Sequence, residues 1–240
     1  MDGFLYLDDY LAIAHKPPGW LVHRTALDRG ESRVMLQAVR DALGRPVWPV
    51  HRLDKGTSGL LVFALDAQVA AWLSARFESG EGLRKTYLAV LRGWTPPQLH
   101  IDHALRRMAD DRRAGRTEVQ SAQTTLHTLA QGTLPVPQPP HAQLRWSLVQ
   151  MQPHTGRRHQ LRRHAKHIAH PMLGDATHGK GPLNRALAEH LGLQRLWLHA
   201  WQLHLPHPIS GATLTLCAPP DASWGTWGPI PVSLPHEPAL

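Results

Sequence analysis

The chain has 240 residues, of which 42% are hydrophobic, and it contains nine tryptophans. This length fits one large domain or two small ones, and the apolar content is sufficient for a packed core, which excludes a disordered chain. Lys and Arg (26) exceed Asp and Glu (18) by eight, and the 18 histidines can add positive charge beside phosphates. A polyanionic partner is therefore expected, although a basic balance alone does not identify it.

The chain has a single cysteine, Cys217, which excludes an intrachain disulfide framework and a zinc site built on a pair of thiolates. Residues 1–9 are acidic where a signal peptide would be basic, and no apolar run approaches the length of a membrane span. The sequence thus predicts a cytoplasmic protein that does not contact the membrane. No feature indicates an obligate protein partner.

The N-terminal part is predicted to form short strands and two helices. Residues 4–14 are typical of two strands around a turn at Asp8 and Asp9, and the prolines and glycine of 17–19 exclude a helix after them. The predicted helices cover 34–43, capped by Ser32 and ended by Gly44, and a stretch capped by Asp66 that ends near Gly80. Their apolar stripes are interpreted as core-packing surfaces.

Residues 51–59 read His-Arg-Leu-Asp-Lys-Gly-Thr-Ser-Gly, and the apolar run 60–65 follows them. Asp54 therefore stands between Arg52 and Lys55 in a short polar loop before a buried strand. A carboxylate in such a loop can be a nucleophile, a general base or a metal ligand. A surface turn with a local salt bridge is an equally good interpretation of the spacing.

The middle of the chain alternates between strands and irregular segments. Residues 85–93 have the alternation of a strand, which places Tyr87 on the same side as Lys85. Residues 103–117 carry five arginines without a clean period and are interpreted as a basic loop. Strands are predicted over about 119–130 and 143–152, separated by a Pro-rich loop, 132–140, that cannot hold a central strand.

The densest basic segment, 152–170, contains four Arg, one Lys, five His and no acidic residue. Thr155 and Gly156 precede a predicted helix, whose N-terminus favours an anion. The histidines at 164, 167 and 170 have a spacing that could suggest a metal site. However, zinc usually recruits further Cys, Asp or Glu ligands. We therefore predict a helix that faces phosphates, with no metal and no other cofactor.

Several of these segments together resemble the RluA family of pseudouridine synthases. Residues 51–59 match the catalytic motif of that family, 85–93 its Lys-x-Tyr motif, and 155–175 its third motif. Lys16 and Pro17 match the first motif, although His15 stands where the family usually has Asn. The later residues, with His178 where most of the family has Tyr, look most like the TruC branch. The resemblance covers about 5–216 and is weakest between 95 and 140.

The resemblance implies an α/β fold of the α+β type, the pseudouridine synthase catalytic fold. In it a bent, largely antiparallel mixed sheet is flanked by helices, and the active site lies in a central cleft. One catalytic domain is expected over 1–218, followed by a Pro-rich tail over 219–240. Because the first motif begins near residue 15, no separate N-terminal RNA-binding domain is expected.

By the same resemblance Asp54 is the catalytic carboxylate and Tyr87 lies against the target base. Arg162 is expected to pair with Asp54 and keep it charged, because a guanidinium can bind a carboxylate with two nitrogens. Arg52 is expected to fill the space that the flipped nucleotide leaves. Further contacts to RNA are expected from basic side chains, namely Lys16, Arg157, Arg158, Arg163 and Lys166.

The implied activity is the isomerisation of a uridine to pseudouridine in tRNA, at uridine 65 where the acceptor stem meets the T arm. A synthase that acts on ribosomal RNA is one alternative, and a non-catalytic RNA-binding protein with the same basic surfaces is another. A Ser/His hydrolase ranks last, because the sequence contains no Gly-x-Ser-x-Gly nucleophile elbow.

Overall fold

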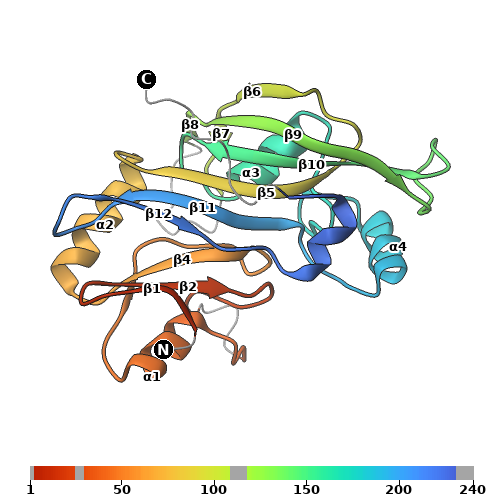
Figure 1. Cartoon of the computed structure of the whole chain (residues 1–240). Helices are drawn as coiled ribbons and strands as arrows, with labels where there is room; N and C mark the ends of the chain where they lie inside the picture. The colour runs from red at the N-terminus through yellow and green to blue at the C-terminus, as the bar shows by residue number, and fades with distance from the viewer. Residues whose placement is uncertain (1–2, 25–29, 109–117, 231–240) are drawn as a thin grey trace.

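Ten strands form one sheet in the computed structural model, which describes residues 3–24, 30–108 and 118–230 (Figure 1). The main path of the sheet is β1 (Phe4–Leu7), β2 (Leu11–Lys16), β4 (Ser58–Ala64), β11 (Leu198–Pro206), β5 (Arg84–Arg92), β10 (Leu144–Pro153), β9 (Gln123–Leu134) and β6 (Gln98–Asp102). β3 (Trp48–Pro49) joins β4, and β12 (Thr213–Cys217) joins β11. Among the paired strands of the described chain, only β4 and β11 run parallel. The expected largely antiparallel mixed sheet is confirmed.

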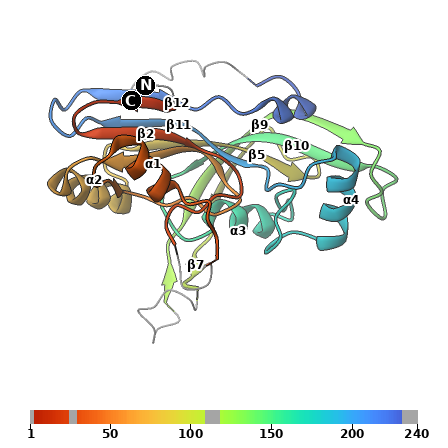
Figure 2. The same ribbon diagram turned by 90° about the horizontal axis from the view of Figure 1, so that it is seen from below.

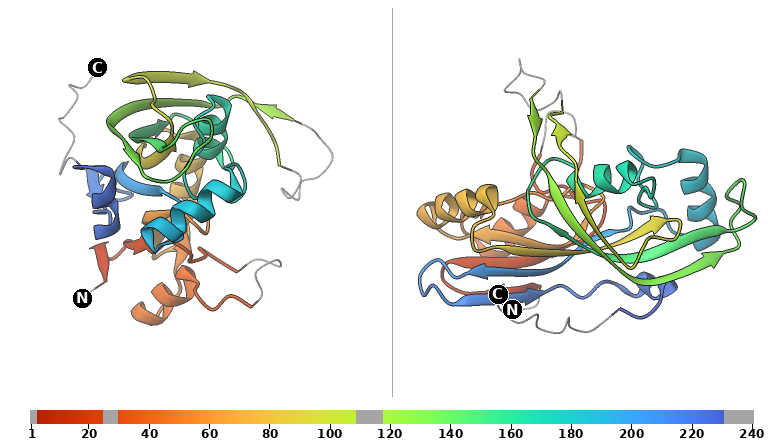
Figure 3. Two further views of the ribbon diagram at one scale, coloured as in Figure 1. Left: turned by 90° about the vertical axis from the view of Figure 1, so that its right-hand side faces the viewer. Right: turned by 90° about the horizontal axis from the view of Figure 1, so that it is seen from above.

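The four α-helices lie on one face of this sheet, and a 3₁₀ helix lies on the other (Figures 2 and 3). They are α1 (Met35–Leu43), α2 (Ala67–Ser79), α3 (Gln160–His167), α4 (Gly181–Leu191) and the 3₁₀ helix η2 (Ala222–Trp227). A small arm of β7 (Leu105–Arg106) and β8 (Val119–Gln120) projects on the side of α3. None of the helices in the described ranges is both long enough and apolar enough to cross a membrane.

Local sequence explains α2 fully and α1 in part. The Asp66 side chain accepts hydrogen bonds from the first-turn amides of α2, and Gly80 (φ 83°) ends that helix, both as predicted. Gly44 ends α1 as predicted, but the expected Ser32 cap is wrong, because Val34 holds the N-cap position without a side-chain bond. The amides of residues 35 and 36 instead donate to the carbonyls of residues 21 and 22, at 2.8 and 3.0 Å. A neighbouring chain segment thus replaces the cap.

The strands follow the predictions with two exceptions, both in the strand expected over about 119–130. β1, β2, β5 and β10 lie where alternation placed them. The expected strand is divided into β8, which belongs to the small arm, and β9, which begins at Gln123. β9 also runs on to Leu134 and takes in three residues assigned to the Pro-rich loop. Gly132 pairs with Trp146 of β10, and a Cβ atom on Gly132 would overlap the Trp146 ring. The glycine therefore lets the indole lie against the strand, and the loop starts only at Pro135.

β11 joins the two halves of the molecule. On one edge it pairs with β5, and on the other it pairs first with β4 and then with β12. One buried apolar cluster gathers residues of β2, β4, α1 and α2, and two others gather residues of β5, β10, α3 and α4. Gly59 (φ 110°) permits the close approach of β4, because a Cβ atom there would overlap the backbone of Ala200.

The C-terminal segment packs into the second half. Trp224 and Trp227 of η2 are 1% and 0% exposed, and both rings contact Trp197 edge-on at centroid distances of 5.4 and 4.9 Å. The boundary expected at residue 218 therefore does not mark an edge of the packed structure, which continues through 219–230. The remainder of the expected tail, 231–240, lies outside the described residues, as does most of the basic loop, 109–117.

Removal of a buried η2 tryptophan should destabilise the whole fold. We expect Trp227→Ala to lower the free energy of unfolding by about 3–5 kcal/mol, the usual loss when a buried aromatic side chain is truncated. Trp94, which is 50% exposed and stacks under Arg145, is the matched control. Trp94→Ala should lower the free energy of unfolding by only about 1 kcal/mol. Urea unfolding measures both values, and equal small losses would show that η2 adds nothing to the core.

Candidate active site

Asp54 lies in the loop between β3 and β4, and a buried lysine anchors that loop. Lys16 Nζ donates to the backbone carbonyls of residues 17, 55 and 57 at 2.7–3.0 Å, and its side chain is 0% exposed. Burial lowers the pKa of Lys16 to about 7, while the charge of Asp54 acts in the opposite direction. The expected contact of Lys16 with RNA is therefore wrong. Its ammonium group is enclosed and holds the loop that carries Asp54 instead.

His51 anchors the other end of the same loop. Its Nε2 accepts a hydrogen bond from the amide of Val62 at 3.0 Å, and its ring stacks on Phe77 at a centroid distance of 4.3 Å. Burial, with the charge of Lys85, lowers the pKa of His51 to about 3. The ring is thus a neutral acceptor that holds the backbone of β4.

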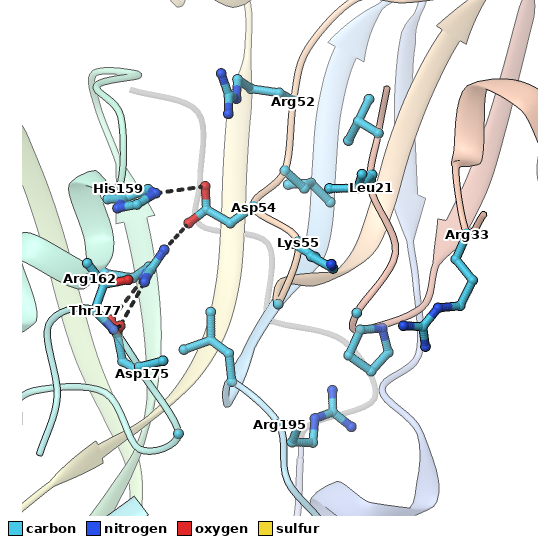
Figure 4. Close-up of a pocket in the computed structure, with 18 of the residues that line it drawn as sticks. Leu21, Arg33, Arg52, Asp54, Lys55, His159, Arg162, Asp175, Thr177 and Arg195 are labelled. Carbon is cyan, nitrogen blue, oxygen red and sulfur yellow. Dashed lines mark hydrogen bonds and ion pairs between the residues drawn. The ribbon is translucent and has the colours of Figure 1, made fainter. Parts of the chain in front are cut away.

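Arg162 binds two carboxylates at once (Figure 4). Its Nη1 donates to Asp54 Oδ2 at 2.7 Å, while Nε and Nη2 donate to the two oxygens of Asp175 at 2.8 and 2.7 Å. The Arg162 and Asp54 side chains are 8% and 19% exposed, and that of Asp175 is 0% exposed. The ion pair between Arg162 and Asp54, predicted from residues far apart in sequence, is present.

Sequence reasoning gave Asp175 no role, although it closes the matched third motif. Besides the two bonds from Arg162, it accepts hydrogen bonds from the amides of Thr177 and His178, each at 2.9 Å. Burial alone would raise the pKa of Asp175, but these hydrogen bonds outweigh burial and hold the pKa below its usual value. Asp175 therefore remains a carboxylate and fixes the plane of the guanidinium.

His159 faces the other oxygen of Asp54, and His178 lies behind it. His159 Nε2 lies 3.6 Å from Asp54 Oδ1, and His159 Nδ1 lies 3.1 Å from His178 Nε2. His159 has a left-handed backbone (φ 53°, ψ 25°) at the start of α3, where sequence reasoning had placed only a phosphate-facing helix. Neither histidine could be assigned a role from spacing, because the direction of the ring depends on that backbone conformation.

Tyr87 and Asp54 line the same cavity, of about 470 Å³. This volume lies in the range of about 300–1,000 Å³ that is common for small-molecule sites. Burial, with the charge of Asp54, raises the pKa of Tyr87 above its usual value, so the phenol keeps its proton. Asp54 also lines a second cavity, of about 1,330 Å³. Besides Arg162, its lining includes six Arg and Lys side chains: Arg24, Arg33, Arg52, Lys55, Arg158 and Arg195.

Comparisons with known proteins agree with this geometry. The model of the RNA pseudouridylate synthase family matches residues 10–167. The chain is 44% identical to a tRNA pseudouridine synthase C of Yersinia pestis over 92% of this chain and 87% of that protein. It is 43% identical to one of Vibrio cholerae over 92% of this chain and 91% of that protein. The chain belongs to the RNA pseudouridylate synthase family. This confirms the resemblance drawn from its motifs.

Solved structures give the same result. Human RNA pseudouridylate synthase domain containing 1 is 26% identical and superposes with a TM-score of 0.71 over 91% of this chain and 83% of that one. Human RNA pseudouridylate synthase domain containing 4 is 27% identical and gives 0.69 over 94% and 92%. The synthase is accordingly an enzyme that isomerises uridine to pseudouridine.

The basic side chains expected to contact RNA lie in different places in the synthase. Arg52 is exposed and lines both cavities, as does the half-buried Arg158. Arg157 lines the smaller cavity and donates from Nε to the carbonyl of residue 121 at 3.0 Å. Arg163 and Lys166 lie on α3 away from both cavities, with Lys166 exposed.

The three histidines that could have suggested a metal site contact separate groups. His164 is buried and lies 2.9 Å from Thr124 Oγ1, whereas the His167 ring stacks on His103 at a centroid distance of 3.6 Å. His170 Nδ1 lies 2.8 Å from the carbonyl of residue 92. Within the described ranges, no three or more His, Cys, Asp or Glu side chains are grouped so that they could hold a metal ion.

The charge of Asp175 should stabilise the fold in a pH-dependent way. Its pKa is depressed on folding, so its contribution is present above the unfolded pKa of about 3.9 and is lost as pH falls through the folded pKa. We expect Asp175→Asn to lower the free energy of unfolding by about 3–5 kcal/mol at pH 7, because a buried ion pair is broken. Below about pH 4 the difference from wild type should shrink.

Urea unfolding at pH 7 and pH 3 measures this difference. Asp9→Asn, on an exposed turn, is the control and should change the free energy by less than about 0.5 kcal/mol at either pH. A loss in Asp175→Asn that is equal at both pH values would show that the carboxylate charge is not what stabilises the site.

Proposed function

We propose that this synthase acts on tRNA in the cytoplasm, with Asp54 as its catalytic carboxylate, and that its target is uridine 65. The observation that carries the proposal is the carboxylate of Asp54, held by Arg162 at 2.7 Å in a cavity that Tyr87 also lines. The names of the similar bacterial proteins support tRNA as the substrate.

The chemistry explains why such a carboxylate is needed. Pseudouridine formation breaks the bond between N1 and C1′, turns the base, and joins C5 to C1′. A carboxylate can attack at neutral pH and leave again, so it can hold one fragment while the other rotates. The guanidinium of Arg162 compensates the charge of Asp54 when the base closes the cavity, since a buried carboxylate without a partner would be costly. The isomerisation involves no redox change, which fits an enzyme without a cofactor.

The cavities fit a flipped nucleotide. Removing a base from its stack costs a few kcal/mol, as in other base-flipping enzymes. In our proposal Tyr87 stacks on the uracil in the smaller cavity, and Arg52, which lines both cavities, fills the gap in the RNA. Phosphate contacts from Arg157, Arg158 and the outer face of α3 offset the cost of flipping.

Replacement of the carboxylate should separate catalysis from binding. We expect Asp54→Asn to abolish pseudouridine formation, because an amide has the same shape but is not a nucleophile. RNA affinity should be no weaker than that of the wild type, since the substitution removes a negative charge from a basic cleft. Single-turnover assays and filter binding with tRNA transcripts measure the two properties. Appreciable turnover by a clean Asp54→Asn preparation would contradict the assigned role.

The substrate can be found by mapping pseudouridines in total RNA from cells with and without this protein. We expect the cells that lack it to lose one tRNA pseudouridine, at position 65, and to keep those of ribosomal RNA. Loss of a ribosomal site instead would show that the RNA class is wrong while the chemistry stands. An Asp54→Asn copy that restores growth or function without restoring the modification would favour the non-catalytic alternative.

A further inference from the structure

We propose that His159 takes the proton from uracil C5 during the reaction and that His178 relays it to solvent. The proposal rests on the proposed role of Asp54 as the catalytic carboxylate, and it takes the fragment that Asp54 holds to be the sugar, at C1′. It assigns a catalytic group for a step that neither Asp54 nor Arg162 explains.

The atom balance of the isomerisation requires this step. When C5 bonds to C1′ it still carries its hydrogen, and the ring has an N1=C6 double bond in place of C5=C6. The proton must then leave C5. The electron pair of the C5–H bond becomes C5=C6, and the N1=C6 electrons pass to N1, which takes a proton from water. The protein group that accepted the C5 proton then gives it to solvent, so nothing is oxidised or reduced. A base beside the new bond would accelerate the step.

His159 occupies the right place for that base. The new bond forms at C1′, where Asp54 acts, and His159 Nε2 lies 3.6 Å from Asp54 Oδ1. Arg162 donates to the other oxygen, and both side chains approach the carboxylate from the same side (Figure 4). A separation of 3.6 Å is too long for a good hydrogen bond. The Nε2 atom is therefore not committed to Asp54 and can accept a proton from a uracil that lies beside the two side chains.

The second ring nitrogen of His159 provides an exit for the proton. Nδ1 lies 3.1 Å from His178 Nε2, with the two rings edge-on at 80°. When Nδ1 carries the hydrogen and donates it to His178, the Nε2 lone pair faces Asp54. As Nε2 gains the C5 proton, Nδ1 can release its own to His178, which is half-buried and reaches solvent.

The backbone is shaped to aim this ring. His159 and Ala169 are the two non-glycine residues with positive φ in the described ranges. A left-handed backbone is uncommon for a residue with a side chain, and such strain concentrates at functional sites. At residue 159 it starts α3 and turns the imidazole back to Asp54. A histidine that only bound phosphate would need no such turn.

The charges around His159 keep it neutral before the reaction. Burial lowers the pKa of His159 to about 4, with further lowering by Arg162, His178 and Arg158 against an opposing effect of Asp54. Its lone pair is thus available at neutral pH. Arg162 has no lone pair to offer. Lys85 lines the same cavity, and burial lowers its pKa, so it is the rival acceptor together with Tyr87.

A deuterium experiment tests the assignment. Whole tRNA transcripts are made with uridine or with 5-deuterouridine, and single-turnover rates are measured at saturating enzyme. We expect His159→Asn to be slower than the wild type by about 100-fold or more. It should also show a primary isotope effect at C5 larger than that of the wild type, because proton removal then limits the rate. Asn tolerates the left-handed backbone, so the fold should be kept.

Two further variants complete the test. His178→Phe should show a smaller loss of rate with the same increase in the isotope effect, and it keeps the test decisive if His159→Asn fails to fold. His190→Gln, on the exposed end of α4, is the control and should match the wild type. A slow His159→Asn without an increased isotope effect would overturn the proposal. So would an increased effect in Lys85→Met or Tyr87→Phe instead.

The wild-type arm separates this inference from the proposed function. If wild-type enzyme converts no uridine of whole tRNA, the tRNA assignment is overturned, and the same rates and isotope effects are then measured on the RNA that pseudouridine mapping identifies. If it converts tRNA and His159→Asn keeps the wild-type rate with either transcript, only the inference is overturned.

Discussion

The guanidinium of Arg162 is the link on which the two halves of this molecule depend. Asp54 belongs to the half built on β4, whereas Arg162 and Asp175 belong to the other half. A buried ion pair offsets the cost of desolvation only when its geometry is good and its remaining polar atoms are satisfied. Here three guanidinium nitrogens each donate at 2.7–2.8 Å, and Asp175 accepts two further backbone bonds. The geometry of the cleft is thus set by the charge pairs that serve its chemistry.

The C-terminal segment, through Asp221, is linked by hydrogen bonds of Arg195 to Ser58 in the motif 51–59. Arg195 Nη2 donates to Ser58 Oγ at 3.0 Å, and Nη1 donates to Asp221 Oδ2 at 2.5 Å. The Ser58 hydroxyl also lies 2.9 Å from His199 Nδ1 on β11. The serine of the catalytic motif is therefore part of a buried network that reaches the residues before η2. The segment expected to be a Pro-rich tail thus helps to place the loop of Asp54. This could not be predicted from the segment itself, because its partner Arg195 and the motif residue Ser58 lie elsewhere in the sequence.

Local signals were sufficient where the local chain decides the structure. Asp66 and Gly80 fixed α2. The pairing of Arg162 with Asp54 was expected from the family resemblance and not from a local signal, because the two residues are far apart in the chain. The failures share one physical cause, which is that the deciding partner lies far along the chain. Lys16 is buried because carbonyls about 40 residues later surround its ammonium. Ser32 is no cap, because backbone carbonyls of another segment satisfy the first amides of α1. Burial and backbone strain of this kind are not visible in composition or periodicity.

The start of α3 explains how one short helix presents some of its basic side chains to Asp54 and others to the outside. Arg162 in the first turn of α3 and His159 at its N-cap, where the backbone is left-handed, face the two oxygens of Asp54. His164 turns inward to Thr124 on the strand below. Arg163 and Lys166 are thereby left on the outer side, although all five belong to one uninterrupted basic segment. If every basic side chain of the helix faced phosphates, no carboxylate would be needed beside it. The placement of Asp54 and Asp175 against its inner face is what separates the side that meets these carboxylates from the outer side of the segment.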